Sequence, residues 1–238
     1  MFGSAIRRNS LLLAGFAVLT TGIIAGTYLG TSERIAAAQR AAEEKALFEI
    51  VPPARHDNEM LEDTVPVGPE DSLLRLKKDK RVFIARQGGE AVAAIIPVNA
   101  PDGYSGNIEL IVGVNRDGSV AGVRALQHRE TPGLGDKVDI KKSDWVLDFE
   151  GHGLDSPPPD QWTVKKDGGV FDQFTGATIT PRAVVMAVRR GLEFFEANRE
   201  RLLGEGTEGE AEVARTPVTV GESAVAHTDA IARGKDRG

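Results

Sequence analysis

An uncharged, mostly apolar run near the N-terminus constrains this chain more than any other feature of its 238 residues. The run covers residues 9–32 and contains the segments LLLAGFAVL and IIAGTYL. A bilayer core requires about 20 predominantly apolar residues in a helix, so this run is long enough to cross it. We predict a transmembrane helix over residues 10–30, with residues 1–9 in the cytoplasm, because Arg7 and Arg8 precede the run and positive charges favour that side.

A cleaved signal peptide is the alternative interpretation of this N-terminus. Arg7 and Arg8 would form its basic segment, and Ala36-Ala37-Ala38 could pass for a cleavage site. The apolar core of a signal peptide is usually about 7–15 residues long, with the cleavage site close behind it. Here the run is longer, and Glu33 and Arg34 separate it from the alanines. We therefore favour an uncleaved anchor with the rest of the chain exported. The absence of cysteine agrees with export without requiring it.

Composition divides the remainder of the chain into a stalk, a domain and a tail. Residues 31–50 are polar and rich in Ala and Glu, which predicts a helical stalk that Val51-Pro52-Pro53 ends. Residues 51–203 are long enough for one domain with its own core, which we expect in the periplasm. Residues 204–238 contain almost no large apolar side chains, so they cannot bury enough surface to offset the entropy of ordering. We predict that this tail is disordered.

Alternating apolar segments in the domain predict two β-hairpins. One covers residues 83–96 and turns at Gly88-Gly89. The other pairs residues 108–114 with residues 120–126 across the turn Asn115-Arg116-Asp117-Gly118.

A short strand and a helix complete the predicted elements. Residues 162–165 have the composition of a strand, and Val184, Val188, Leu192 and Phe195 recur at the spacing of a helix with one buried face. The mixture predicts an α+β or α/β fold, a single domain of β-hairpins and packed helices tethered by one transmembrane helix.

Two polar segments stand out beside these elements. Asp172-Gln173-Phe174-Thr175-Gly176-Ala177-Thr178 lies directly ahead of the helix, where Thr180 and Pro181 form a suitable N-cap and N1 pair. Glu130-Thr131-Pro132-Gly133-Leu134-Gly135 follows the second hairpin. Taken singly, each has an ordinary structural explanation, as a turn with a cap and as a rigid Pro-Gly loop. Both together, in this order, are harder to attribute to chance.

Both segments resemble signature sequences of the RnfG/RsxG family, the G subunits of Rnf-type electron-transport complexes, to which the C subunit of sodium-translocating quinone reductase is related. In those families a dedicated transferase joins FMN through its phosphate to the last Thr of an Asp-x-x-Ser/Thr-Gly-Ala-Thr run, and the second segment lies against the FMN. The resemblance therefore implies covalent FMN on Thr178. The residues it implies for cofactor binding are Thr178, Asp172, Thr175, Gly176, Ala177, Glu130, Thr131, Leu134 and Gly135. Asp172 would either bind the transferase's metal during attachment or cap its local turn.

The physical chemistry of the first segment agrees with this expectation. Thr178 lies just ahead of a helix N-terminus, where free N–H groups and the helix dipole favour an anion such as a phosphodiester. Gly176 would allow the backbone to turn sharply and come close to a ligand.

The resemblance also implies a function and partners. The chain would be an electron carrier in the cell inner membrane, within a complex that couples electron transfer between ferredoxin and a nicotinamide pool to ion translocation. It would work with the other membrane and iron–sulfur subunits of the Rnf complex and would not turn over alone. The alternative is a non-redox, membrane-anchored binding or assembly module in which Thr178 is unmodified.

Composition and missing motifs argue against several other classes, although composition alone leaves a Ser-His-Asp hydrolase open. A net charge of −6 provides no basic field for nucleic acid. The chain has no cysteine for thiolate iron–sulfur ligation, and its four histidines and its carboxylates show no metal-site spacing, so we expect no metal. The Gly-x-Ser-x-Gly elbow of hydrolases and the glycine fingerprint of dinucleotide-binding domains are both absent.

Overall fold

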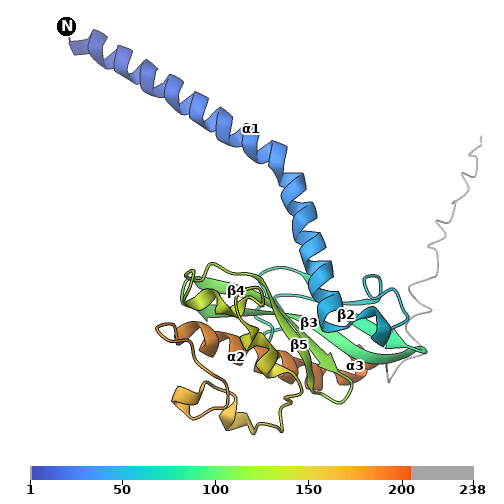
Figure 1. The fold of residues 1–238 in the computed structure, drawn as a ribbon. Helices are drawn as coiled ribbons and strands as arrows, with labels where there is room; N and C mark the ends of the chain where they lie inside the picture. Colours follow the sequence, from blue (N-terminus) through green and yellow to red (C-terminus); the bar gives the residue numbers. More distant parts are fainter. Residues whose placement is uncertain (1, 205–238) are drawn as a thin grey trace, which may run out of the picture. The chain divides into compact units, whose positions relative to one another are not determined.

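The computed structural model describes residues 2–204, which form a long helix followed by a sheet and shorter helices (Figure 1). Helix α1 (Phe2–Ile50) covers both the predicted span and the predicted stalk, and it ends directly before Val51-Pro52-Pro53. Of the predicted tail, 204–238, all but Gly204 lies outside the described residues.

The N-terminal part of α1 has the character of a membrane span. Within residues 2–204 it is the one helix long and apolar enough to cross a bilayer, and the apolar window carries no buried residue. Leu11, Phe16 and Ile24, for example, are each about two-thirds exposed. Because such an apolar surface is unfavourable in water, this segment is suited to lipid and anchors the chain to a membrane.

Five antiparallel strands follow in an up-and-down order, β1-β2-β3-β4-β5. Their bounds are Thr64–Val67, Lys80–Gln87, Glu90–Gly103, Gly106–Asn115 and Val120–Gln127. Both predicted hairpins are confirmed as β2–β3 and β4–β5. Gly88 and Gly89 have φ values of 61° and 86°, the left-handed region that a tight turn requires and that glycine adopts most easily.

Successive residues of a strand point to opposite faces of a sheet. In this sheet both faces are covered. Ala94 and Ile96 of β3 pack in a core with helix α2 (Ile179–Ala197), whereas Ile95 packs with Leu47 and Ile50 at the end of α1. Helix α2 lies along β3 and β4 (Figure 1). The predicted buried face of α2 is confirmed: its four core residues at helical spacing are at most 1% exposed. An antiparallel sheet followed by helices makes the fold α+β.

The end of α1 docks into a notch between two strands. Gly113 of β4 and Gly122 of β5 face each other in register, and Ile50 lies against both. A Cβ atom on Gly113 would lie only 2.2 Å from Cγ2 of Ile50. Beside this contact, Nε of Arg124 pairs with Oε2 of Glu49 at 3.1 Å. The glycines therefore create the space that the stalk occupies.

The predicted strand at residues 162–165 is wrong. Trp162 and Val164 are buried, as a strand pattern requires, but the segment forms only an isolated bridge between Val164 and Phe171. Its side chains join an aromatic core with Phe149 in place of a sheet edge, and Nε1 of Trp162 donates to the carbonyl of Gly153. The remaining described elements are short helices at Pro53–Arg55, Gly135–Val138, Asp144–Phe149, Pro159–Gln161, Lys165–Asp167 and Arg199–Leu203.

Candidate functional site

A cavity of about 590 Å³ lies where the two polar segments meet. This volume is within the range of about 300–1,000 Å³ found for small-molecule and cofactor sites. The residues that line it are Tyr104, Glu130, Thr131, Leu134, Gly135, Lys166, Gly176, Ala177, Thr178, Ile179 and Thr180. Four parts of the chain meet here: the β3–β4 turn, the loop after β5, the short helix Lys165–Asp167, and the first turn of α2 with the residues directly before it.

Thr178 is the N-cap residue of α2, but its side chain does not cap the helix. Its hydroxyl makes no hydrogen bond within residues 2–204, and the residue is half-buried at the cavity. The predicted N-cap and N1 positions of Thr180 and Pro181 are wrong, because α2 begins at Ile179 and both residues belong to its first turn. The hydroxyl of Thr180 is buried instead in a contact with Glu130, which removes it from capping.

The start of α2 offers backbone donors to the cavity. No acceptor in the described part of the chain lies within hydrogen-bonding reach of the N–H groups of Ile179 and Thr180, and Pro181 has no N–H. Such unused N–H groups, together with the helix dipole, favour a bound anion. Lys166 also lines this cavity, and no described carboxylate pairs with its side chain.

The approach to Thr178 is a tight turn. Gly176 has φ of 79°, which an L side chain rarely adopts, and the N–H of Ala177 donates to the carbonyl of Phe174 at 3.1 Å. A Cβ on Gly176 would lie 3.7 Å from Cδ2 of Leu134, so the two polar segments lie close together here.

The loop after β5 is a compact turn around Thr131. The N–H groups of Leu134 and Gly135 both lie 3.1 Å from the Thr131 carbonyl, and Asp136 Oδ1 accepts from the N–H of Gly133 at 2.7 Å. The loop is therefore a hydrogen-bonded Pro-Gly turn after β5, and it also forms one wall of the cavity.

Glu130 places a buried carboxylate in this wall. The residue is 4% exposed. Its Oε1 accepts from the N–H of Ser105 at 2.9 Å, and its Oε2 accepts from the hydroxyl of Thr180. The contact between Glu130 and Thr180 joins the loop after β5 to the first turn of α2, across 50 positions of sequence.

Two of the predicted residues lie outside the cavity. Asp172 and Thr175 are exposed, and neither lines it. The carboxylate of Asp172 pairs with Nζ of Lys165 at 2.8 Å, and no turn-capping hydrogen bond to it is present in the described region. The structure therefore gives no support to the turn-capping role predicted for Asp172.

Four lining residues were not predicted from the sequence as binding residues: Tyr104, Lys166, Ile179 and Thr180. Tyr104 and Ile179 are exposed, at 67% and 46%, and with Leu134 at 42% they give the cavity an apolar mouth. Ile179 and Thr180 directly follow Thr178, so proximity to the motif was a usable signal for both. Tyr104 lies at a hairpin turn and Lys166 in the short helix Lys165–Asp167, and neither has a local pattern that indicates a site.

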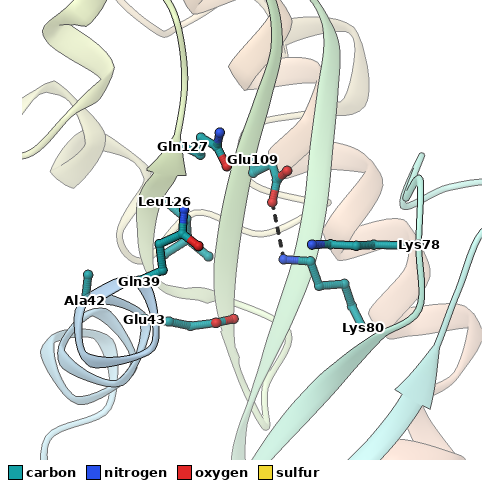
Figure 2. A pocket seen from close by; sticks show the side chains of 8 residues that line it. All are labelled: Gln39, Ala42, Glu43, Lys78, Lys80, Glu109, Leu126 and Gln127. Carbon is teal, nitrogen blue, oxygen red and sulfur yellow. Dashed lines mark hydrogen bonds and ion pairs between the residues drawn. The ribbon is translucent and has the colours of Figure 1, made fainter. Parts of the chain in front are cut away.

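A second cavity, of about 190 Å³, lies between α1 and the sheet. Figure 2 shows Gln39, Ala42 and Glu43 of α1 on one side, with Lys80 and Glu109 opposite them and joined by an ion pair of 3.2 Å. None of the predicted site residues lines it, and its walls are mostly polar. This cavity is therefore separate from the site of the two polar segments. Within residues 2–204, no cluster of three or more His, Asp or Glu residues could hold a metal ion.

Comparison with known protein families gives two separate matches, one to the N-terminal helix and one to the domain that contains the cavity. Residues 1–50 match the family described as RnfG N-terminal region, and residues 103–193 match the family described as FMN-binding domain. The second match contains every residue that lines the cavity.

Proteins named as the G subunit of an ion-translocating oxidoreductase complex are similar over most of the chain. The one from Pseudomonas aeruginosa (strain UCBPP-PA14) is 51% identical over 82% of this chain and 91% of its own length. Those from Pseudoalteromonas atlantica and Vibrio cholerae are 46% and 45% identical, over 88% and 84% of this chain and 97% and 94% of their own. At this identity and coverage, the chain belongs to the family of G subunits of ion-translocating oxidoreductase complexes, and its residues 103–193 form an FMN-binding domain.

Proposed function

We propose that this chain is the membrane-anchored electron carrier of an ion-translocating oxidoreductase complex, with FMN joined through its phosphate to the hydroxyl of Thr178. The observation that carries the proposal is the state of Thr178: the residue is half-buried at a cofactor-sized cavity, and its hydroxyl is used neither for capping nor for any other described hydrogen bond. A threonine that served only the helix would direct this oxygen to a backbone N–H.

The surroundings of Thr178 suit a phosphodiester. The N–H groups of Ile179 and Thr180 are unused, and Lys166 brings a positive charge to the same cavity. These groups would hold the phosphate by the two means that proteins commonly use, a helix N-terminus and a cationic side chain. Gly176 and Ala177 would keep the approach free of large side chains.

The rest of the cavity suits the sugar chain and the ring. Glu130 and Thr131 supply polar atoms, whereas Tyr104, Leu134 and Ile179 supply apolar surface at the mouth. The flavin, when bound, accepts and releases electrons, and the protein's task is to hold it, limit water around it and set its electrostatic environment.

The exposed residues of the polar segment 172–178 suit a different role. Asp172 and Thr175 lie outside the cavity on accessible surface. We assign both to recognition by the flavin transferase, with Asp172 contributing to the transferase's metal site during attachment. Mature protein would then keep its flavin through Thr178 and the cavity, without direct help from these two side chains.

The names of the relatives place the chain in a larger assembly. We propose that it passes electrons between the other membrane and iron–sulfur subunits, between a ferredoxin side and a nicotinamide side, while the complex moves ions across the membrane. The flavin would supply the redox chemistry of the chain, which would act with the other subunits and would not turn over alone.

We further propose that the domain faces the periplasm from the cell inner membrane. Arg7 and Arg8 precede the span, and moving an arginine to the bilayer centre costs about 2.5–3.5 kcal/mol on the insertion scale. Alkaline phosphatase fused to the end of the chain should therefore be active, and protease added to spheroplasts should degrade the domain. A domain that is protected until the inner membrane is broken would overturn this orientation.

Covalent attachment is tested on full-length protein co-expressed with the transferase. Intact mass should show one FMN minus water, and denaturing electrophoresis should show a flavin-fluorescent band. Thr178→Ala should remove both, whereas Thr175→Ser, at a position where the family pattern accepts either residue, should retain both. Thr178→Ala should still fold, because the residue makes no capping hydrogen bond to lose. Unmodified wild-type protein would favour the non-redox anchored module, and flavin that persists in Thr178→Ala would place the attachment elsewhere.

A further inference from the structure

We propose that the Glu130 carboxylate tunes the reduction potential of the flavin and that Thr180 positions this carboxylate. In this arrangement the Glu130 carboxylate lowers the reduction potential of the bound flavin, and the Thr180 hydroxyl keeps the carboxylate in place. The inference rests on the proposed function, since it requires FMN in the cavity. It assigns to Thr180 a role that neither the sequence motif nor helix capping explains.

The hydrogen bonds of Glu130 fix its position and its acceptor role. Oε1 accepts from the N–H of Ser105 at 2.9 Å, and Oε2 accepts from the hydroxyl of Thr180. Both oxygens are therefore engaged in hydrogen bonds, which fixes the orientation of the side chain. The two donors come from the β3–β4 turn and from α2, so the carboxylate is held from two sides while it lines the cavity.

No positive charge in the described part of the chain forms an ion pair with Glu130, although the residue is 4% exposed. Burial of a charged group is costly unless the group is paired or well hydrogen-bonded. A carboxylate has about four acceptor sites, and the protein uses two of them here. The remaining capacity is available to a hydrogen-bond donor in the cavity, such as a ribityl hydroxyl or a ring N–H of FMN.

Gly135 keeps space open for this pair. A Cβ on Gly135 would lie 2.8 Å from Oε2 of Glu130 and 2.9 Å from Oγ1 of Thr180. Any larger residue would therefore press on the two oxygens that form the contact. The glycine, the carboxylate and the hydroxyl form one unit, built from two segments that are distant in sequence.

The expected electrostatic effect has a definite sign. A negative charge close to the flavin disfavours the added electron density of the reduced form, because like charges repel more strongly in a partly buried site than in water. The reduction potential of the flavin should therefore be lower with Glu130 than with a neutral side chain at the same position. Loss of the Thr180 hydroxyl should weaken this effect by releasing one oxygen of the carboxylate.

The test uses full-length, FMN-loaded protein in detergent, with loading verified by intact mass and the midpoint potential measured by spectroelectrochemistry. Glu130→Gln removes the charge but keeps the shape, and we expect a more positive potential. Thr180→Val removes the hydroxyl but keeps the shape, and we expect a smaller shift in the same direction. Thr180→Ser retains a hydroxyl and should restore the wild-type value. Thermal unfolding of the unloaded chains gives a second readout. If the role of Thr180 is purely structural, its substitution will change the unfolding temperature but not the potential of the flavin.

Each outcome has a distinct meaning. Wild-type protein without covalent FMN would defeat the proposed function, whereas loaded Glu130→Gln protein with an unchanged potential would defeat only this inference. If Thr180→Val alters unfolding but not the potential, the contact is structural and the positioning role is wrong. Loss of loading in Thr180→Val but not in Thr180→Ser would also contradict the inference, by assigning the hydroxyl to attachment.

Discussion

Docking of the stalk depends on the absence of a side chain at Gly113, so Gly113→Ala is the most direct perturbation of how the anchor joins the domain. The new Cβ would lie 2.2 Å from Cγ2 of Ile50 and 3.4 Å from Cβ of Ala121. The first distance is too short for any real contact, so Ile50, which is 3% exposed, must move. Overpacking of this kind costs about 1–3 kcal/mol. For a chain of this size, the unfolding midpoint of the domain should fall by about 2–12 °C.

The control is the neighbouring glycine. A Cβ on Gly122 would lie 3.3 Å from Cγ1 of Ile50, a contact that a shift of a few tenths of an ångström can relieve. Gly122→Ala should therefore cost clearly less than Gly113→Ala, although both alter the same notch. Near-UV circular dichroism is a suitable assay on the full chain in detergent, because both tryptophans, Trp145 and Trp162, are buried in the domain.

A double-mutant cycle identifies the clash as the cause. Ile50→Ala alone should cost about 2–5 kcal/mol through lost burial. Combined with Gly113→Ala it should cost less than the sum, by about 1–3 kcal/mol, because the shortened side chain leaves room for the new methyl group. Additive costs, or a Gly113→Ala protein as stable as wild type, would refute the reasoning, since the notch would then not be what accommodates the stalk.

Three further predictions concern single residues. Lys166→Gln should lower the fraction of chains loaded with FMN, measured by intact mass. The exposed Lys142 lies outside the cavity, so Lys142→Gln should not; equal loading of the two variants would exclude a phosphate contact from Lys166. Gly135→Val should change the flavin absorption spectrum without preventing attachment, and an unchanged spectrum with normal stability would make its loop a mere connector. The hydroxyl and N–H of Ser119 bond to Asp117 and lower the pKa of this carboxyl group. The stability it contributes is present above its unfolded pKa and is lost as pH falls through the lower folded pKa. Asp117→Asn should remove this acid-side loss in denaturant titrations from neutral pH to about pH 2, and an unaltered pH profile would contradict it.

Local patterns in the sequence were sufficient for the elements whose signals are local. The apolar run indicates a membrane span, because the hydrophobic effect acts on the summed surface of neighbouring residues. Glycine pairs and Asn-Arg-Asp-Gly indicate hairpin turns because they tolerate the required dihedral angles. The segment at residues 162–165 shows the limit of such patterns, since its alternating burial serves an aromatic core and no strand pairs with it over more than a single bridge.

The sequence by itself determined that this chain has an anchor, a stalk, an antiparallel hairpin domain and two motifs of a flavoprotein family. Only the tertiary structure decided how the two motifs come together at one cavity. Glu130 and Thr180 meet across 50 positions of sequence, and this distance in the chain leaves no local pattern. The same holds for Lys166 and Tyr104, which reach the cavity from a short helix and a hairpin turn, and for Asp172, which lies exposed at the surface. The physical reason is that propensity and periodicity act over a few neighbouring residues, whereas a binding site is formed by packing between segments that are distant in sequence.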